Sequence, residues 1–284
     1  MTVCIAARCF VKETNSQYIV TVSDTKLTTG SYSKEMATLK LRNLSSTWKC
    51  LIAGKFAQSG PVIDKIIGAM SREMNLTDSR VRAICTEALI AENGRLAEEG
   101  VLSRYGLTMD TFLKSRESLG EGIFERLWSE IGATRFECDL LVCGFDGTHA
   151  HIFVATNPTS DNASFITDFD YPGFAAIGTG GYLAESTLYA FSQNPVSSLE
   201  ETLYMTTTAK FIAESASDVG EQTFIYAFGA DGTVIDIDKA LRRELRERWK
   251  KVGRPRIPES GLTLIRQHVP MLKPKEMVAS EGET

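Results

Sequence analysis

The chain has 284 residues, of which 43% are hydrophobic and 24% are charged, and its net charge is −5. This balance is ordinary for a globular protein and gives no electrostatic basis for binding nucleic acid. The six cysteines do not form a disulfide scaffold, no apolar run approaches membrane-spanning length, and the first residues lack the pattern of a signal peptide. We therefore expect a cytoplasmic protein of one large or two small domains, with neither nucleic acid nor membrane as a partner.

The first half of the chain is predicted to begin with strands and continue with helices. Val3, Ile5 and Ala7 alternate with other residues, and a polar stretch separates them from a second run rich in β-branched residues, which is typical of a hairpin. Strands are expected at 3–11, 18–27, 39–44 and 48–54. The apolar spacing then becomes helical. Helices are expected at 59–74 and 81–100, with Asp78 as a possible cap of the second and broken helix over 101–133.

Strands return in the second half. Asp146-Gly147 and Asp231-Gly232 each lie between two strand-like runs, and such dipeptides are strong hairpin signals. Strands are expected at 138–147, 150–157, 174–180, 223–230 and 233–238, and helices at 181–194 and 199–216. Strands that cluster in hairpins indicate antiparallel sheets. Two such sheets face to face, with helices on their outer faces, would bury the alternating apolar residues, so the expected class is α+β.

Five segments resemble proteasome β-type subunits and their bacterial relatives. They read MTVCIAARC (1–9), IVTVSDTKLTTG (19–30), ATLKLRNL (37–44), CLIAGKFAQ (50–58) and AAIGTGG (175–181). The resemblance implies the N-terminal-nucleophile hydrolase fold, a four-layered αββα sandwich of two antiparallel sheets. It implies a domain over 1–239 with a helical insertion at about 90–133. The charged residues 240–284 then form a C-terminal extension that we expect to be partly disordered.

Thr2 is the candidate nucleophile. A hydroxyl needs a base to attack, and a threonine at the N-terminus carries its own in the α-amine, whose reference pKa is about 7.7–8.0. That pKa lies near working pH, where proton transfer is most effective. The mechanism requires removal of Met1, which the small side chain of Thr2 permits. Taken alone, Thr2 is better interpreted as an ordinary second residue, since many proteins begin Met-Thr.

Lys40 and Asp24 complete the candidate catalytic set. The resemblance implies that Lys40 lies beside the hydroxyl of Thr2 and lowers its pKa, and that Asp24 pairs with this lysine. A buried lysine needs such a partner, or it loses its charge. Without the resemblance, Lys40 reads as a solvated lysine on a strand face and Asp24 as a turn residue.

The resemblance also assigns roles to residues outside this set. Gly54 matches the glycine whose amide stabilises the oxyanion, and Thr179 matches a serine that supports the N-terminal amine. Asp218, with Ser215, is the nearest match to an amine-orienting pair, although the order is reversed. The residues expected to line the substrate pocket are Leu27, Thr28, Thr38, Arg42, Ile52 and Phe56. Arg42 would favour an acidic substrate side chain, and any of these residues could instead serve packing.

Other patterns have plainer interpretations. His149 and His151 lie two residues apart on one face of a predicted strand, a spacing that can hold a metal, but no carboxylate set accompanies them in the sequence. We expect a surface pair there, and neither a metal nor another cofactor. The turn at 178–181 lacks the lysine and spacing of a P-loop.

The leading hypothesis is a threonine-type peptidase that works as a subunit of a homo-oligomeric, proteasome-like ring. Its substrates would be peptides or unfolded proteins, and an ATP-dependent unfoldase could deliver them. Two alternatives stay open. One is a non-catalytic ring or scaffold subunit, which the long insertion and extension would serve. The other is a small-molecule amidase of the same superfamily.

Overall fold

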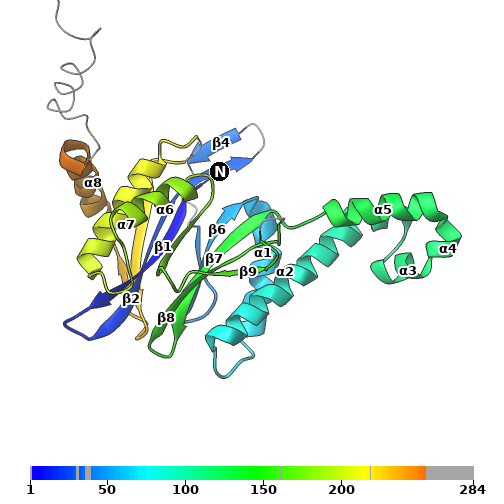
Figure 1. Ribbon diagram of the computed structural model, residues 1–284, viewed down its shortest axis with the longest axis horizontal. Helices are drawn as coiled ribbons and strands as arrows, with labels where there is room; N and C mark the ends of the chain where they lie inside the picture. The colour runs from blue at the N-terminus through cyan, green and yellow to red at the C-terminus, as the bar shows by residue number, and fades with distance from the viewer. Residues whose placement is uncertain (1, 30–31, 36–39, 160–161, 218, 254–284) are drawn as a thin grey trace, which may run out of the picture. The chain divides into compact units, whose positions relative to one another are not determined.

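The computed structural model describes residues 2–29, 32–35, 40–159, 162–217 and 219–253, and at residues 27–29 and 32–35 it describes the backbone alone. The fold is α+β, with two five-stranded antiparallel sheets and helices (Figure 1). The chain divides into one compact unit, Met1–Leu245, and a second unit, Arg246–Thr284. The expected domain boundary after residue 239 stays a prediction.

The expected strands occur in their expected order, and two short strands, at 32–35 and 166–168, were not predicted. The first sheet runs β10 (Phe174–Ile177), β1 (Cys4–Val11), β2 (Ser16–Asp24), β11 (Thr223–Gly229) and β12 (Val234–Asp236). The second sheet runs β5 (Leu41–Asn43), β6 (Trp48–Gly54), β7 (Cys138–Asp146), β8 (His149–Ala155) and β9 (Ile166–Asp168). A separate pair consists of β3 (Lys26–Thr29) and β4 (Tyr32–Glu35). Every sheet neighbour pairs antiparallel, as the hairpin signals predict.

The helices fall into groups between the strands. Between β6 and β7 lie α1 (Phe56–Met70), α2 (Asp78–Gly100), the short 3-10 helix Leu102–Tyr105, α3 (Met109–Lys114), α4 (Arg116–Leu119) and α5 (Glu121–Ala133). Between β10 and β11 lie α6 (Gly181–Ala190) and α7 (Leu199–Ala213). After β12 come α8 (Lys239–Arg248) and a π-helical turn, Trp249–Gly253. Helix α1 begins three residues before the predicted start at 59, so Pro61 lies inside it rather than in its first turn.

Alternation along β1 and β6 explains how the sheets pack. Cys4 and Ala6 join a buried cluster that also holds Leu51 and Ala53 of the second sheet. The intervening Ile5 and its alternate neighbours join a cluster with α6 and α7. Each sheet thus has one face toward the other sheet and one toward helices, which is consistent with the expected sandwich.

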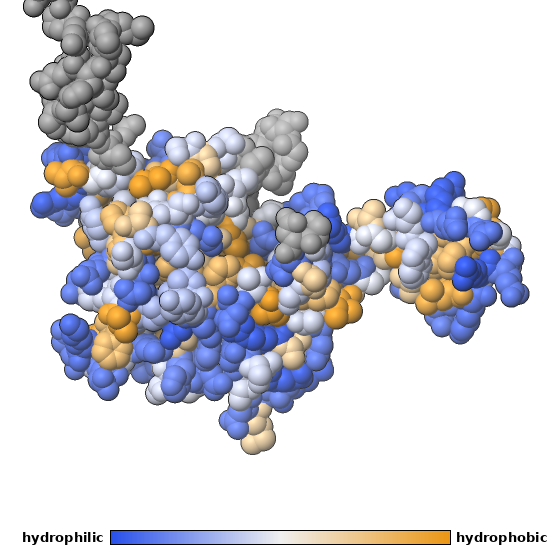
Figure 2. All heavy atoms as spheres, in the orientation of Figure 1, coloured by the Kyte–Doolittle hydropathy of each residue, from blue (hydrophilic) through white to orange (hydrophobic). Residues whose placement is uncertain are grey.

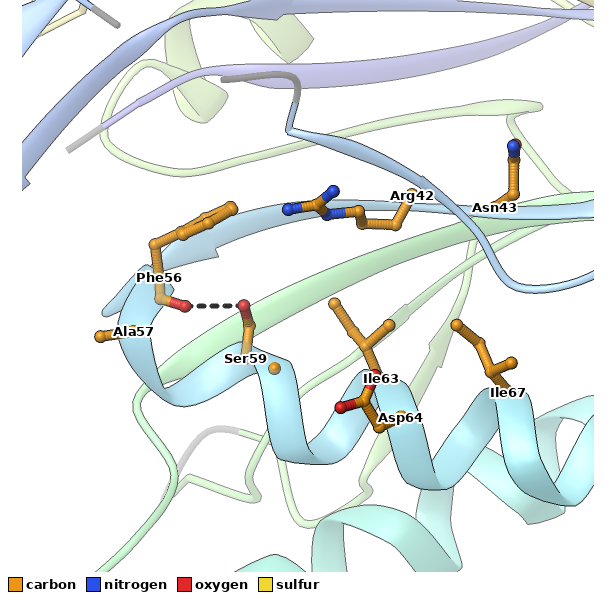
Figure 3. A pocket seen from close by; sticks show the side chains of 9 residues that line it. Arg42, Asn43, Phe56, Ala57, Ser59, Ile63, Asp64 and Ile67 are labelled. Atoms are coloured by element: carbon orange, nitrogen blue, oxygen red, sulfur yellow. Dashed lines mark hydrogen bonds between the residues drawn. The ribbon is translucent and has the colours of Figure 1, made fainter. Parts of the chain in front are cut away.

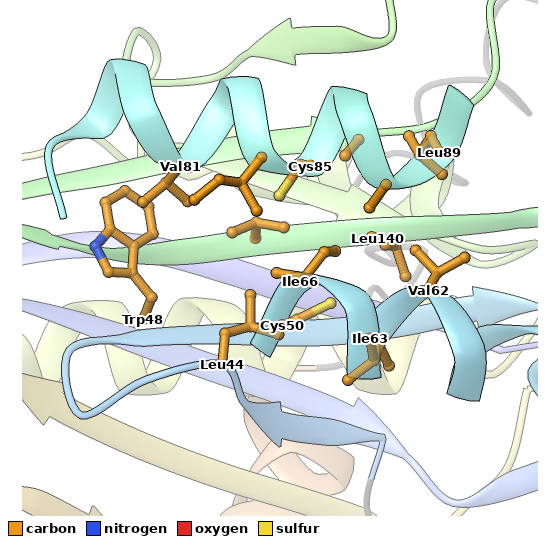
Figure 4. Close-up of a cluster of buried hydrophobic side chains, with 14 of the residues drawn as sticks. Leu44, Trp48, Cys50, Val62, Ile63, Ile66, Val81, Cys85, Leu89 and Leu140 are labelled. Carbon is orange, nitrogen blue, oxygen red and sulfur yellow. The ribbon is translucent and has the colours of Figure 1, made fainter. Parts of the chain in front are cut away.

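Helices α1 and α2 cover the outer face of the second sheet. Their apolar residues recur at helical spacing and meet alternate residues of β6 and β7 (Figure 4). The side chains that Figure 4 labels are Leu44, Trp48, Cys50, Val62, Ile63, Ile66, Val81, Cys85, Leu89 and Leu140. Ile52 also belongs to this cluster and is 1% exposed.

The segment after α2 has an apolar cluster of its own. Val101, Leu102, Phe112 and Leu127 form it, and the rings of Phe112 and Phe124 stack with centroids 4.6 Å apart. Trp128 remains about half exposed, and Figure 2 shows apolar side chains among the polar surface of this segment. Among the described residues, no helix is long and apolar enough to span a bilayer.

All six cysteines are buried and free. Burial raises the pKa of the Cys4, Cys9, Cys85, Cys138 and Cys143 thiols to about 12. They therefore pack as small apolar residues, as expected, and form no disulfide framework.

Candidate functional site

Thr2, Asp24 and Lys40 meet at one end of the first sheet. The register of β1 on β2 pairs Cys4 with Ser23, so Thr2 lies beside the end of β2. The hydroxyl Oγ1 of Thr2 donates a hydrogen bond to Oδ1 of Asp24 and accepts one from Nζ of Lys40. Nζ of Lys40 lies 2.6 Å from the same Oδ1. The fold thus brings Thr2 into contact with residues that lie 22 and 38 positions away in the sequence.

The site is almost completely enclosed. Thr2 is 3% exposed, Lys40 1% and Asp24 0%. An isolated ammonium or carboxylate would be very unfavourable there, so the ion pair between Lys40 and Asp24 is what allows both charges to be buried. The alternative of a solvated Lys40 is therefore wrong. Its ammonium also lies where it would stabilise negative charge on Oγ1 of Thr2.

A break in the second strand creates this arrangement. The sequence predicts one strand over 18–27, but β2 ends at Asp24 and β3 begins at Lys26. The carboxylate of Asp24 accepts from the amide of Lys26 at 3.2 Å, so the side chain itself organises the bend. Lys40 likewise lies just before β5, in a bend rather than within the strand.

Besides Lys40 and the hydroxyl of Thr2, backbone amides also donate hydrogen bonds to the carboxylate of Asp24. Oδ1 also accepts from the amide of Val3 at 3.0 Å, and Oδ2 accepts from the amide of Gly220 at 2.9 Å. Charge-assisted bonds of this kind fix a carboxylate firmly. Gly220 was absent from the sequence-based set, and no local pattern marks a residue that acts through its backbone amide.

The turn after β10 holds the main chain of Thr2. The amide of Gly180 donates to the carbonyl of Thr2 at 3.2 Å, and Oγ1 of Thr179 lies 3.4 Å from the same oxygen. Gly178 has φ +88°, and a Cβ there would lie 2.3 Å from this carbonyl. A glycine is therefore required at residue 178 for Thr2 to reach its place.

Gly54 ends β6 and is exposed. Its φ is +102°, and a Cβ would lie 2.3 Å from the carbonyl of Glu137. The close approach of β7 thus accounts for the glycine, and its role toward an oxyanion stays a prediction. Asp218 lies outside the described residues, as does Thr38.

Two of the residues expected to line a substrate pocket do border a hollow, and its role toward a substrate stays a prediction. Arg42 and Phe56 line a hollow of about 450 Å³ between β5 and α1, with the guanidinium carbon of Arg42 5.9 Å from the ring centroid of Phe56 (Figure 3). Asp64 also lines this hollow, so its charge opposes the preference for acidic side chains that Arg42 implies. The structure places the Ile52 side chain in the hydrophobic core instead. Leu27 and Thr28 lie in β3, where the backbone alone is described.

His151 belongs to an ionic network that the sequence did not reveal. Its Nδ1 lies 2.6 Å from Asp170 and 3.7 Å from Asp78, and Asp170 raises the pKa of its imidazole. The interpretation of His149 and His151 as a simple surface pair is wrong, because carboxylates from α2 and the β9–β10 connection do surround His151. In the part of the chain that is described, these three residues could offer ligands to a metal ion, yet Arg82 already binds both carboxylates.

Comparisons with known proteins support the fold alone. No family model and no curated protein matches the chain. Among solved structures, it is similar to the Anbu (Gly-1) mutant from Hyphomicrobium sp. strain MC1, with a TM-score of 0.56 and 14% sequence identity. The similarity covers 88% of this chain and 94% of that chain. The chain therefore shares the fold of that protein.

Proposed function

We propose that this protein is an N-terminal-nucleophile hydrolase of the threonine-peptidase type, built on a four-layered αββα sandwich. One observation carries the proposal. The hydroxyl of Thr2 contacts both a buried ammonium, Lys40, and a buried carboxylate, Asp24, next to the chain's N-terminus. A buried ion pair that encloses an ordinary second residue would serve no purpose in packing, because apolar residues stabilise a core at least as well.

The reaction begins once Met1 has been removed. While Met1 is attached, the nitrogen of Thr2 is an amide, so Thr2 lacks the base that the attack requires. Removal of Met1 creates a primary amine on the same residue. This amine takes the proton of Oγ1 as the oxygen attacks a peptide carbonyl carbon.

The Thr2 amine carries the proton in both halves of the reaction. The new C–O bond forms an ester with Thr2, the C–N bond of the peptide breaks, and the proton held by the amine passes to the leaving amine. Water then attacks the ester while the Thr2 amine takes one of its protons, which returns to Oγ1 as the acid leaves. We assign to the amide of Gly54 the stabilisation of the negative charge that develops on the carbonyl oxygen.

Lys40 and Asp24 have distinct roles in this scheme. The ammonium of Lys40 stabilises the alkoxide character of Oγ1 without exchanging its own proton. Asp24 pairs with Lys40 and orients its side chain through the 2.6 Å contact. Thr179 supports the main chain of Thr2 by its bond to the carbonyl. Asp218 remains a candidate for orienting the amine.

We extend the proposal to assembly and substrate. A proteasome-like fold favours a homo-oligomeric ring in the cytoplasm that hydrolyses peptides or unfolded proteins, to which an ATP-dependent unfoldase could deliver substrate. The hollow beside Phe56 would receive a substrate side chain, with Arg42 and Asp64 both at its wall. A ring subunit without activity and a small-molecule amidase are the outcomes that the next experiment separates.

The test is the intact mass of purified protein before and after incubation with a peptide epoxyketone or a β-lactone. We expect loss of Met1 and a single adduct that maps to Thr2. Thr2→Val should abolish the adduct. Thr21→Val, which removes another buried hydroxyl from β2, should retain it.

The alternatives predict other results. Retained Met1 with no adduct would overturn the peptidase assignment and favour a scaffold subunit. An adduct at Thr2 with turnover of small acyl amides, but none of peptides or unfolded protein, would favour an amidase.

A further inference from the structure

Lys210 is a second buried lysine near the candidate site. It lies on α7, its side chain is 0% exposed, and Nζ pairs with Glu214 one turn further along the helix. Nζ also donates to the carbonyl of Gly220 at 2.7 Å and to the carbonyl of Glu221 at 3.0 Å. Lys210 therefore joins α7 to the segment that leads into β11.

This arrangement needs a physical reason. Burial of an ammonium is unfavourable unless charge and hydrogen bonds compensate it, and an apolar side chain would fill the same space without that difficulty. The carbonyls of Gly220 and Glu221 come from a segment that forms neither helix nor strand, so the ladder of a sheet does not fix them. The ammonium does.

The same segment contacts Asp24 on its other side. The amide of Gly220 donates to Oδ2 of Asp24 at 2.9 Å, in a fully buried contact. Rotation of a carboxylate about its last torsion is soft, so its orientation depends on its donors. With Oδ2 held by Gly220, Oδ1 is directed at Lys40 and Thr2.

We propose that Lys210 is a positioning residue for the nucleophile, acting through Gly220 and Asp24. The path has three links: ammonium to the Gly220 carbonyl, Gly220 amide to Oδ2, and Oδ1 to Lys40 and Thr2. The functional consequence rests on the proposed peptidase activity. The structural consequence, that Lys210 fixes the Gly220 amide, does not rest on it.

The experiment replaces Lys210 by methionine, which keeps the length of the side chain and removes its charge. Lys49→Met is the matched control, because Lys49 is also buried and bonds to a side chain, Asn43, rather than to the Gly220 segment. Amide hydrogen exchange is measured for peptides that contain Val3 and residues 219–225. Steady-state peptide hydrolysis is measured in parallel.

We expect Lys210→Met to raise exchange at 219–225 and to lower kcat by about 10-fold to 100-fold at nearly unchanged KM, since misplacement of a catalytic group affects the chemical step. Lys49→Met should leave kcat and this exchange as in the wild type. Exchange and kcat both unchanged in Lys210→Met would overturn the proposal.

Amide hydrogen exchange distinguishes a failure of the proposed peptidase activity from a failure of the positioning role of Lys210. A wild type without hydrolytic activity, with faster exchange at 219–225 in Lys210→Met, would reject the peptidase and keep the positioning role. If Lys210→Met does not fold, exchange of the Gly220 amide in the wild type decides. Protection comparable to that of β11 supports the anchor, and rapid exchange rejects it.

Discussion

Gly178 offers a sharp test of where the first residues lie. Its φ is +88°, and a Cβ at this position would lie 2.3 Å from the carbonyl oxygen of Thr2 and 2.8 Å from its Cγ2. An alanine at positive φ costs about 1–2 kcal/mol from conformation alone. The overlap with a main-chain oxygen adds about 1–3 kcal/mol, a typical range for overpacking. Gly178→Ala should therefore destabilise the fold by about 2–5 kcal/mol.

A second glycine isolates the contribution of the overlap. Gly232, in the turn between β11 and β12, has φ +81° and no atom within 4 Å of an added Cβ. Gly232→Ala should cost only the conformational part, about 1–2 kcal/mol. The difference between the two variants, from urea unfolding midpoints at equal slope, measures the contact with Thr2.

The first residues could also move away to relieve the overlap. In that case Gly178→Ala loses less stability, but Thr2 leaves Asp24 and Lys40 and no longer reacts with an epoxyketone. Equal stability of the two variants, together with wild-type labelling of Thr2 in Gly178→Ala, would refute the placement of Thr2 against this turn.

Three further predictions follow from the buried and charged groups. Lys40→Met leaves the Asp24 carboxylate buried without its cation and should destabilise the fold by about 3–5 kcal/mol in urea unfolding. Lys114→Met, which breaks an exposed pair with Asp110, should cost less than about 1 kcal/mol. Equal effects of the two substitutions would contradict the burial of the Lys40–Asp24 pair. The raised pKa of His151 means that its ion pair with Asp170 contributes fully below the unfolded histidine pKa of about 6.5, and that this contribution is lost as pH rises through the higher folded value. The decline in the unfolding midpoint over that window should be absent in His151→Gln, and an unchanged decline would assign it to another group. Native protein should leave all six cysteines unreactive toward a thiol reagent at pH 8, because their burial, and for most of them a pKa near 12, keeps them as inaccessible thiols; rapid labelling of any of them before unfolding would contradict this.

The sequence by itself predicted the elements well where local physics decides. Alternation at Val3, Ile5 and Ala7 predicts β1, and the structure assigns the two alternate sets to different core clusters. Asp146-Gly147 and Asp231-Gly232 predict hairpins, and Gly147 and Gly232 adopt the positive φ that such turns need. These signals need only neighbours in the chain, so they can be read without the fold.

The tertiary structure decided the composition of the site. Thr2, Asp24 and Lys40 could be chosen by resemblance, but their contacts depend on the break at Thr25 and on Lys40 lying before β5. Ile52 was expected in a pocket and lies in the core, because the face that a strand residue presents depends on which layer covers it. One donor to the carboxylate of Asp24 comes from a still more distant part of the sequence. Gly220 lies 196 residues from it, and it contributes an amide that every residue type except proline possesses. No sequence pattern can mark such a donor, because only sheet order and register bring it to the carboxylate.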